Sequence, residues 1–251
     1  MIRSTFIILP RVGNVTERGL WKKGITTWGD FLCRSHIEGI GDERKSTMDD
    51  RLEDADRFLE MGRSDYFCSL LPTVEQWRLF STFVDDAAYL DIETDGIGPG
   101  ARTTVVTVHS KKGTTTLIRG IDLTSEGLAK ALAGAKMLIT FNGSSFDLPV
   151  LSKEFPFTVP RVPHFDLRHG AHRIGHVGGL KLLEERFGIR RPQEVAYVTG
   201  EEAVYLWRLW EKQKKENALR LLVRYNREDT VNLEKIAGIV YDKLVEKTWR
   251  D

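Results

Sequence analysis

Two carboxylates, Asp91 and Glu93, stand at the end of an apolar run in the segment Ala-Tyr-Leu-Asp-Ile-Glu-Thr-Asp-Gly. If this run is a β-strand, residues two apart point to the same face, so both acids lie side by side. Like charges at the exit of a buried strand are unfavourable unless a cation compensates them, and a divalent metal ion is the simplest such cation. The alternative is that the strand ends at Leu90 and both acids are solvated turn residues.

A third acid, Asp147, follows a later predicted strand in the segment Phe-Asn-Gly-Ser-Ser-Phe-Asp-Leu-Pro. The pattern places it in the first turn of a helix. Taken alone, a carboxylate there is a favourable partner for the helix dipole, an effect of about 0.3 to 1 kcal/mol. Asp147 therefore gains a chemical interpretation only together with the other acids.

The last helical segment supplies a fourth acid, Asp229, which falls on an apolar stripe whose members step by three or four residues. Tyr225 lies one turn earlier on the same side, so its phenol is expected beside this carboxylate. A tyrosine on such a stripe is more often a plain core residue. Four acids on core elements of an α/β domain nevertheless form the oxygen-rich pocket that Mg²⁺ or Mn²⁺ requires.

The elements that must position these acids follow from periodicity and turn residues. Strands are predicted at 87–92, 103–109, 114–119, 137–141 and 162–165, helices at 46–62, 73–80 and 128–133 and from 143 to about 155, and mostly helix beyond 165. Ser46 or Thr47 is expected to cap the first helix, and Thr73 with Gln76 to form a capping box for the second. The first three strands, joined by short glycine-containing turns, predict an antiparallel meander.

Three motifs in this order resemble the exonuclease motifs of the DnaQ-like superfamily, which has an RNase H-like fold. They are Asp91-Ile-Glu93, the segment from Asn142 to Asp147, and Tyr225-Asn-Arg-Glu-Asp229, whose Tyr-x-x-x-Asp form marks the DEDDy branch. The leader and the Leu-Asp-Ile-Glu-Thr context also resemble, more loosely, the YprB-type RNase H-like group. The resemblance implies an α/β mixed sheet flanked by helices and a metal-dependent 3′-5′ exonuclease.

The resemblance also implies roles for the five residues. Asp91 would bridge two divalent ions, Mg²⁺ or Mn²⁺, Glu93 and Asp229 would complete one site, and Asp147 would hold the second ion. Tyr225 would orient the attacking water, since a phenol with an ordinary pKa of ~10 is a poor base at neutral pH. The implied partner is nucleic acid, with single-stranded DNA 3′ ends favoured over RNA.

Candidate substrate-binding residues flank these motifs and are Thr94, Asp95, Asn142, Phe146, Arg168 and Lys181. Grooves for single strands combine aromatic rings with basic side chains, which favours the last three. His169, His172 and His176 recur at helical spacing, but no Cys or acid nearby completes a tetrahedral zinc site.

Composition restricts the remaining classes. The 251 residues carry 37 Lys plus Arg against 36 Asp plus Glu, so nucleic-acid binding must be local, as in the basic stretch 161–191. The longest apolar runs, such as 6–9, are far too short to cross a bilayer, and no signal-peptide core is recognisable, so a cytoplasmic location is expected. Cys33 and Cys68 are too few for a disulfide framework and are interpreted as buried thiols.

The change in pattern near residue 85 predicts two domains, a helical module at 1–84 and an RNase H-like exonuclease domain at 85–251. The leader from Leu9 to Trp28 resembles a helix-hairpin-helix element, which either presents backbone amides to phosphates or only caps the domain. Two rival functions stay open, an RNase H-type endonuclease and a catalytically silent nucleic-acid-binding domain. The presence of all four acids and the tyrosine argues against the silent domain. The oligomeric state is left open.

Overall fold

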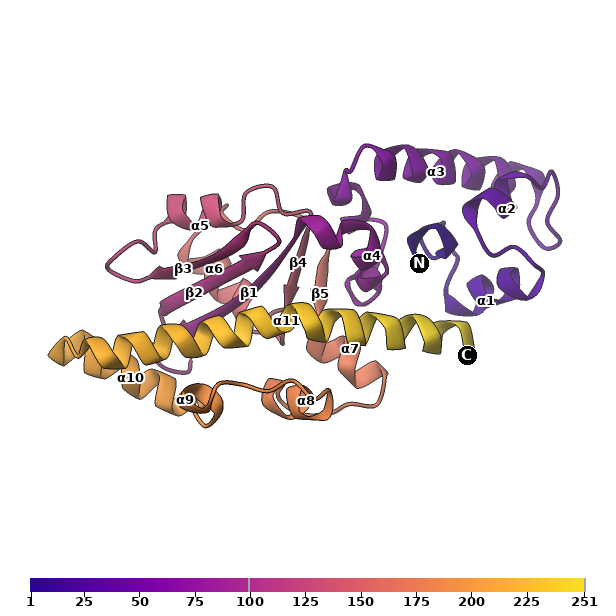
Figure 1. The fold of residues 1–251 in the computed structure, drawn as a ribbon. Coiled ribbons are helices and arrows are strands. Elements are labelled where there is room, and N and C mark those ends of the chain that lie inside the picture. The colour runs from indigo at the N-terminus through magenta and orange to yellow at the C-terminus, as the bar shows by residue number, and fades with distance from the viewer. Residues whose placement is uncertain (99, 251) are drawn as a thin grey trace.

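The structure is a computed structural model that describes residues 1–98 and 100–250 (Figure 1). The α-helices are α1 (Asn14–Lys22), α2 (Trp28–Leu32), α3 (Asp42–Glu60), α4 (Phe80–Phe83), α5 (Ser125–Ala131), α6 (Asp147–Glu154), α7 (Leu167–Arg173), α8 (Leu180–Arg186), α9 (Gln193–Ala196), α10 (Gly200–Gln213) and α11 (Glu216–Arg250). The 3₁₀ helices are η1 (Ile2–Ser4), η2 (Ser64–Cys68), η3 (Thr73–Leu79) and η4 (Val84–Asp86). The strands are β1 (Ala87–Thr94), β2 (Thr103–Ser110), β3 (Gly113–Ile118), β4 (Met137–Thr140) and β5 (His164–Asp166).

The strands form one mixed sheet in the order β3-β2-β1-β4-β5. The first three strands make the predicted antiparallel meander, β4 runs parallel to β1, and β5 runs parallel to β4. The pairing of β1 with β2 shifts register between Glu93 and Thr94. Such irregularities re-aim side chains and often lie beside functional sites. The α/β fold with an RNase H-like mixed sheet and a helical N-terminal module is confirmed.

Side chains of β1 alternate between two cores on opposite faces of the sheet. Ala88, Leu90 and Ile92 belong to the cluster formed with α5 and α6, whereas Ala87 and Tyr89 belong to the cluster formed with α7 and α11. Strand β1 continues to Thr94, so the alternative in which it ends at Leu90 is wrong. Since the strand period is two, the two acids at 91 and 93 continue the second series and face α11.

Helix α11 has 35 residues and a length of about 50 Å. It crosses the whole sheet, and its C-terminal end lies beside the N-terminal module (Figure 1). There Trp249 packs on Trp21 of α1, with ring centroids 4.6 Å apart. None of the described helices is both long enough and apolar enough to span a membrane.

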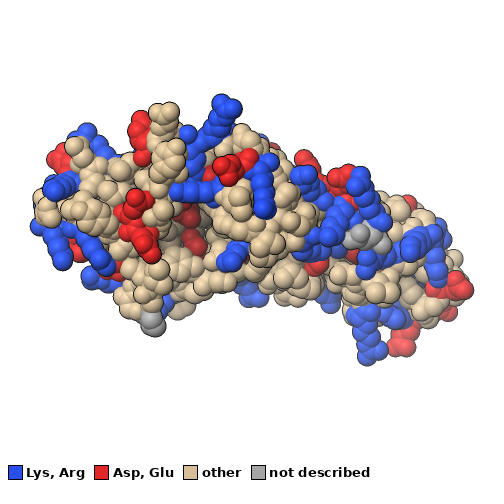
Figure 2. All heavy atoms as spheres, turned by 90° about the horizontal axis from the view of Figure 1, so that it is seen from below, with Lys and Arg blue, Asp and Glu red and all other residues tan. Residues whose placement is uncertain are grey.

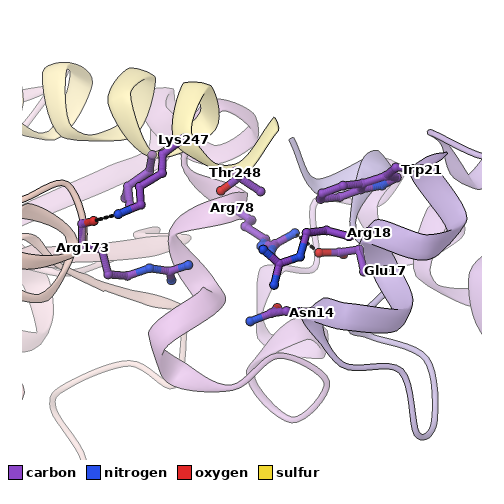
Figure 3. A pocket seen from close by; sticks show the side chains of 9 residues that line it. Asn14, Glu17, Arg18, Trp21, Arg78, Arg173, Lys247 and Thr248 are labelled. Atoms are coloured by element: carbon purple, nitrogen blue, oxygen red, sulfur yellow. Dashed lines mark hydrogen bonds and ion pairs between the residues drawn. The ribbon is translucent and has the colours of Figure 1, made fainter. Parts of the chain in front are cut away.

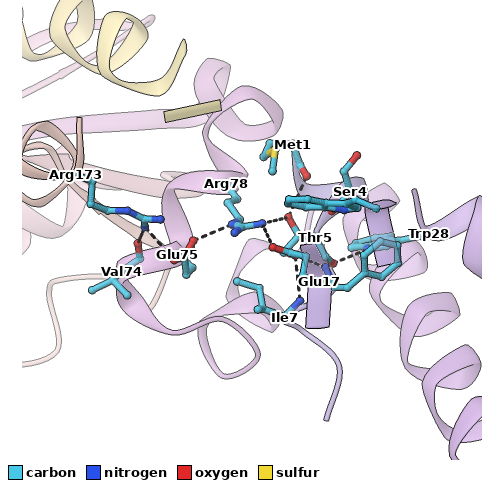
Figure 4. Close-up of polar contacts among 12 residues, drawn as sticks. Met1, Ser4, Thr5, Ile7, Glu17, Trp28, Val74, Glu75, Arg78 and Arg173 are labelled. Atoms are coloured by element: carbon cyan, nitrogen blue, oxygen red, sulfur yellow. Dashed lines mark hydrogen bonds and ion pairs between the residues drawn. The ribbon is translucent and has the colours of Figure 1, made fainter. Parts of the chain in front are cut away.

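A chain of ion pairs, buried except at its Arg173 end, ties the N-terminal residues to the rest of the molecule (Figure 4). Arg78 of η3 donates from Nη1 to Glu17 (2.9 Å) and from Nε to Glu75 (2.8 Å). Glu75 also accepts from Arg173 of α7 at 3.0 Å. We call these four residues the joint.

The core also continues across the predicted domain boundary. One hydrophobic cluster extends from Phe6 in the N-terminal module to the C-terminal half of α11. The division into domains at residue 84 stays a prediction.

Several local expectations are wrong. Helix α3 begins at Asp42 with Gly41 as its N-cap, so Ser46 and Thr47 lie within the helix. The side chain of Gln76 forms no capping box with Thr73, because its buried amide serves backbone groups of other segments instead. It donates to the Leu71 carbonyl and accepts from the His164 amide.

The expectation of buried thiols is also wrong. Cys33 is exposed, because it is the C-cap residue at the end of the short helix α2. Cys68 lies at the end of η2 and is half-buried.

Candidate active site

Three of the four predicted acids meet where β1 ends against α11. Oxygens of Asp91, Glu93 and Asp229 all lie within 4.8 Å of one another. The strand brings the first two together because of its pleat, and the apolar stripe of α11 presents the third. Asp229 is buried, whereas Asp91 and Glu93 are half-buried. The group is therefore both crowded and reachable from solvent.

Asp147 approaches the same strand from helix α6. It is the first residue of this helix, it is buried, and its Oδ1 accepts a hydrogen bond from the Ile92 amide at 3.1 Å. Among the neighbouring acids, Asp147 acts most strongly on the charge of Asp91. The four acids taken from three separate motifs therefore lie in one cluster.

Hydrogen bonds hold the loop before α6 in place. Asn142 in this loop has a left-handed φ of 67°, a conformation that asparagine tolerates better than most residues. Asp166 at the end of β5 accepts hydrogen bonds from the backbone amides of Asn142 (2.8 Å) and Ser144 (3.1 Å). These contacts fix the loop that places Asp147, and Asp166 is a positioning residue that sequence reasoning missed.

Burial raises the pKa of every acid in the cluster. The pKa values of Asp91 and Glu93 lie well above their ordinary values, first because of desolvation and then because of the neighbouring acids. Desolvation also raises the pKa of Asp147 to about 7 and that of Asp229 to about 6. A site that disfavours its own negative charge is suited to a positively charged ligand.

Arg191 supplies part of the counter-charge to the acid cluster. Its guanidinium forms an ion pair with Asp229, while its Nε donates to the buried Glu184 at 2.5 Å. One guanidinium shared between two carboxylates leaves most of the acidic charge uncompensated. The sequence patterns single out neither Arg191 nor Glu184, and the only signal is that both lie in the basic stretch 161–191.

Asn226 of α11 is a second residue for which the sequence predicts only a place on the apolar stripe. It is fully buried, and its Nδ2 donates to Asp91 Oδ2 at 2.7 Å. Within the described residues its Oδ1 is buried without a hydrogen-bond partner, as is Nη2 of Arg191. Of these two atoms, the Asn226 amide oxygen is an acceptor beside clustered carboxylates, so it adds an oxygen to a donor set that fits a hydrated cation.

The phenol of Tyr225 lies against Asp229, and its ring is flanked by Lys181 Nζ (5.5 Å) and the Arg191 guanidinium (5.9 Å). Burial and the nearby acids raise the pKa of Tyr225 far above the ordinary value. Tyr225 therefore stays protonated at every physiological pH, and its hydroxyl is a hydrogen-bond donor held against the Asp229 carboxylate.

The remaining predicted residues make contacts of their own within the chain. Asn142 Oδ1 accepts from Arg168 at 2.8 Å, so these two predicted residues contact each other. Lys181 donates to the backbone carbonyls of Ala196 (3.3 Å) and Val198, so it braces the segment around α9.

Of the three further residues, Thr94 ends strand β1, Asp95 lies in the loop that follows it, and Phe146 lies in the loop before α6. Thr94 is buried and donates to the Gly96 carbonyl at 2.7 Å. Asp95 accepts from the Arg102 amide at 2.8 Å, and Phe146 is the half-buried N-cap residue of α6. Their contacts within the chain are thus structural, and contact with substrate stays a prediction for all six residues.

Comparison with known proteins gives the family. The chain is similar to a family B DNA polymerase from the archaeon Pyrobaculum calidifontis (18% identity, TM-score 0.44), and the match covers 64% of this chain but only 24% of the polymerase. It is also similar to the EXO domain of Aedes aegypti Nibbler (14% identity, TM-score 0.38), and this match covers 68% of the present chain and 85% of the EXO-domain chain. No curated protein sequence matches significantly. A family model of the RNase_H superfamily matches residues 88–241, more than half of the chain, and the chain therefore belongs to the RNase H superfamily.

Proposed function

We propose that this protein is a metal-dependent nuclease that releases nucleotides from the 3′ end of single-stranded nucleic acid, with DNA preferred. The single observation that carries the proposal is the cluster of four acids, for which the described residues supply only one shared guanidinium as counter-charge. Without a ligand, each unbalanced buried charge in such a cluster opposes folding. Membership of the RNase H superfamily supports phosphodiester hydrolysis as the reaction class.

The donor set fits divalent metal ions. All four groups are carboxylates, the ligands that Mg²⁺ and Mn²⁺ prefer. Asp91, Glu93 and Asp229 would hold one ion, and Asp91 with Asp147 a second. Bound ions at such a site supply a more acidic water and stabilise charge on the phosphoryl oxygens.

The protein's own groups then have distinct tasks. Tyr225 donates a hydrogen bond that orients the attacking water, since its raised pKa excludes it as a base. Asn226 fixes one rotamer of Asp91, and the loop bound by Asp166 fixes Asp147. Each of these contacts reduces the motion that the reacting groups would otherwise lose at the transition state.

The choice of a 3′-5′ exonuclease rests on the resemblance of the three motifs to the DEDDy exonucleases. The test uses 5′-labelled single- and double-stranded DNA and RNA with Mg²⁺, with Mn²⁺ and with EDTA. We expect a ladder of products one nucleotide apart that requires metal, and resistance of 3′-blocked strands. Cleavage of a circular single strand would instead identify the endonuclease.

One observation favours the silent nucleic-acid-binding alternative, namely that Arg191 already pairs with Asp229. Titration calorimetry with Mn²⁺ separates the two functions, because an active site should take up metal and lose that uptake in Asp91→Asn. Absence of metal uptake by the wild-type protein, together with retained oligonucleotide binding, would establish the silent domain.

A further inference from the structure

A polar cavity of about 340 Å³ lies between helix α1 and the C-terminal end of α11 (Figure 3). We name it the α1–α11 cleft. Four cationic side chains line it, Arg18 from α1, Arg78 from η3, Arg173 from α7 and Lys247 from α11. The described wall of this cleft contains none of the four clustered acids, so it is a separate site.

The positive charge of this cleft exceeds its negative charge. Among the described residues that line the cleft, Glu17 is the one acid. A further acid, Glu75, is not part of the lining but accepts hydrogen bonds from Arg78 and Arg173. Both acids are buried, and Glu17 is already occupied by the Phe6 amide and by Arg78. Figure 2 shows Lys and Arg side chains gathered where the N-terminal module meets the rest of the molecule. The cleft is therefore an electrostatic site for an anion.

Some side chains of the cleft are fixed by hydrogen bonds and still have N–H donors that bind no other group of the described chain. The buried Arg78 is fixed through Nε and Nη1, whereas its Nη2 makes no hydrogen bond in the described part of the chain. Arg18, half-buried, forms neither an ion pair nor a hydrogen bond there, and its side chain converges with that of Arg78 (Figure 3). Lys247 is exposed and uses one bond, to the Arg173 carbonyl at 2.6 Å. Pre-positioned guanidinium donors match the geometry of a phosphate.

Helix α11 links this cleft to the acids. Asp229 and Lys247 lie about five helical turns and about 27 Å apart along it, so both project from the same side of the helix. At the rise of about 3.4 Å per nucleotide of a stacked strand, this distance corresponds to roughly eight nucleotides. A strand extended to about twice that rise covers the same distance with roughly four nucleotides, whereas a strand of about three nucleotides is too short to reach from Asp229 to Lys247.

We propose that the α1–α11 cleft binds a backbone phosphate of the nucleic-acid strand whose 3′ end lies at the four acids. The inference rests on the proposed nuclease function and adds to it a second anchor point, and hence a dependence on strand length. A strand too short to reach from the acids to the cleft occupies only one of the two sites.

The test is fluorescence anisotropy with Ca²⁺ in place of Mg²⁺, so that a cation occupies the carboxylates. It uses two 5′-fluorescein oligothymidylates, one of about 3 and one of about 20 nucleotides, of which only the longer spans both sites. The variant Arg18→Ala/Lys247→Ala removes two cations from the cleft. The matched control Lys112→Ala/Lys130→Ala removes two exposed cations, one from the turn between β2 and β3 and one from α5.

We expect the cleft variant to bind the longer strand about tenfold more weakly and to bind the shorter strand as the wild type does. The slope of log affinity against log salt should fall by about 0.7 in magnitude for the longer strand, because one phosphate contact is lost. The control variant should change neither the affinity for either strand nor the dependence of that affinity on salt. Thermal melting checks that both variants fold.

An equal loss for both strand lengths, or no loss, would overturn the inference. If the wild-type protein still hydrolyses DNA with Mg²⁺ in that case, the proposed nuclease function stands and only the second anchor is wrong. If the wild type binds neither strand, this anchor is wrong, and absence of metal-dependent cleavage in the same preparation would remove the nuclease proposal as well.

Discussion

The joint around Arg78 and the acid cluster around Asp91 both take charged groups out of water, but only the joint is balanced. In the joint, acids and arginines alternate along the chain of ion pairs and satisfy one another over 2.8 to 3.0 Å. In the acid cluster, the cation that the described residues supply in direct contact is Arg191, which is shared with Glu184. A balanced buried network therefore indicates structure, and an unbalanced one indicates a ligand from outside the chain.

This comparison predicts opposite effects of removing charge. Loss of a cation from the joint leaves carboxylates without a partner and destabilises the fold. Loss of an acid from the cluster relieves repulsion, so the fold becomes more stable while the chemistry is lost.

The largest expected effect is that of Asp91→Asn on hydrolysis. We expect a rate at least about 10³-fold lower, equivalent to about 4 kcal/mol, because the proposed shared metal ligand is gone. The metal-free melting temperature should rise, since the amide oxygen still accepts from Asn226 without adding charge. Asp50→Asn, at an exposed acid on α3, is the control and should change neither measurement. Wild-type activity in Asp91→Asn would remove Asp91 from the site.

The joint should respond to Arg78→Ala with a loss of about 3 to 5 kcal/mol in the free energy of unfolding, because Glu17 stays buried without a counter-charge. The matched control is Arg63→Ala, whose ion pair with Asp65 is exposed, and it should cost no more than about 1 kcal/mol. Urea unfolding in EDTA measures both. Similar losses in the two variants would show that the joint is not an energetic unit.

The pH dependence of metal-free stability sharpens the contrast further. Asp147 has a pKa of about 7 in the folded chain against about 4 unfolded, so the folded state binds this proton more tightly. Its destabilising effect is therefore absent below about pH 4 and complete above about pH 7, and is on the order of 4 kcal/mol.

Asp147→Asn should accordingly raise the melting temperature at pH 8 and leave it nearly unchanged at pH 4, in EDTA at both values. Asn keeps an oxygen that can accept from the Ile92 amide, so packing is preserved. An equal shift at both pH values would attribute the effect to packing and not to charge.

Three of the four acids can be predicted from sequence because each breaks a pattern, whereas Asp147 is recognised only together with them. Asp91 and Glu93 interrupt an apolar strand, and Asp229 interrupts an apolar helical stripe, so the periodicity that predicts the fold also reveals the exceptions. The same periodicity does not predict the strand order beyond the meander, since β4 and β5 reach their places through long-range parallel pairing.

The balancing residues cannot be predicted from this periodicity. Arg191 lies in the loop between α8 and α9, far from Asp229 in the sequence, and it reaches that carboxylate only through the path of the loop. Glu184 lies on α8, where its position shows no sign of the arginine that it binds. A contact formed by loop geometry leaves no local periodicity, so the sequence reveals the excess charge and not its counter-charge.

The smallest effect we predict is that of Tyr225→Phe, which keeps the ring between Lys181 and Arg191 and deletes only the hydroxyl. If the hydroxyl orients the attacking water, single-turnover hydrolysis should fall about 10²-fold with substrate affinity little changed. Tyr205→Phe, at an exposed tyrosine on α10, is the matched control and should leave the rate unaltered. If Tyr225 is only a core residue, the rate should stay the same and the change should appear in the melting temperature instead. That result would remove the chain from the tyrosine-dependent branch, and Tyr225 would then belong with the structural residues, as the joint does, and not with the acids.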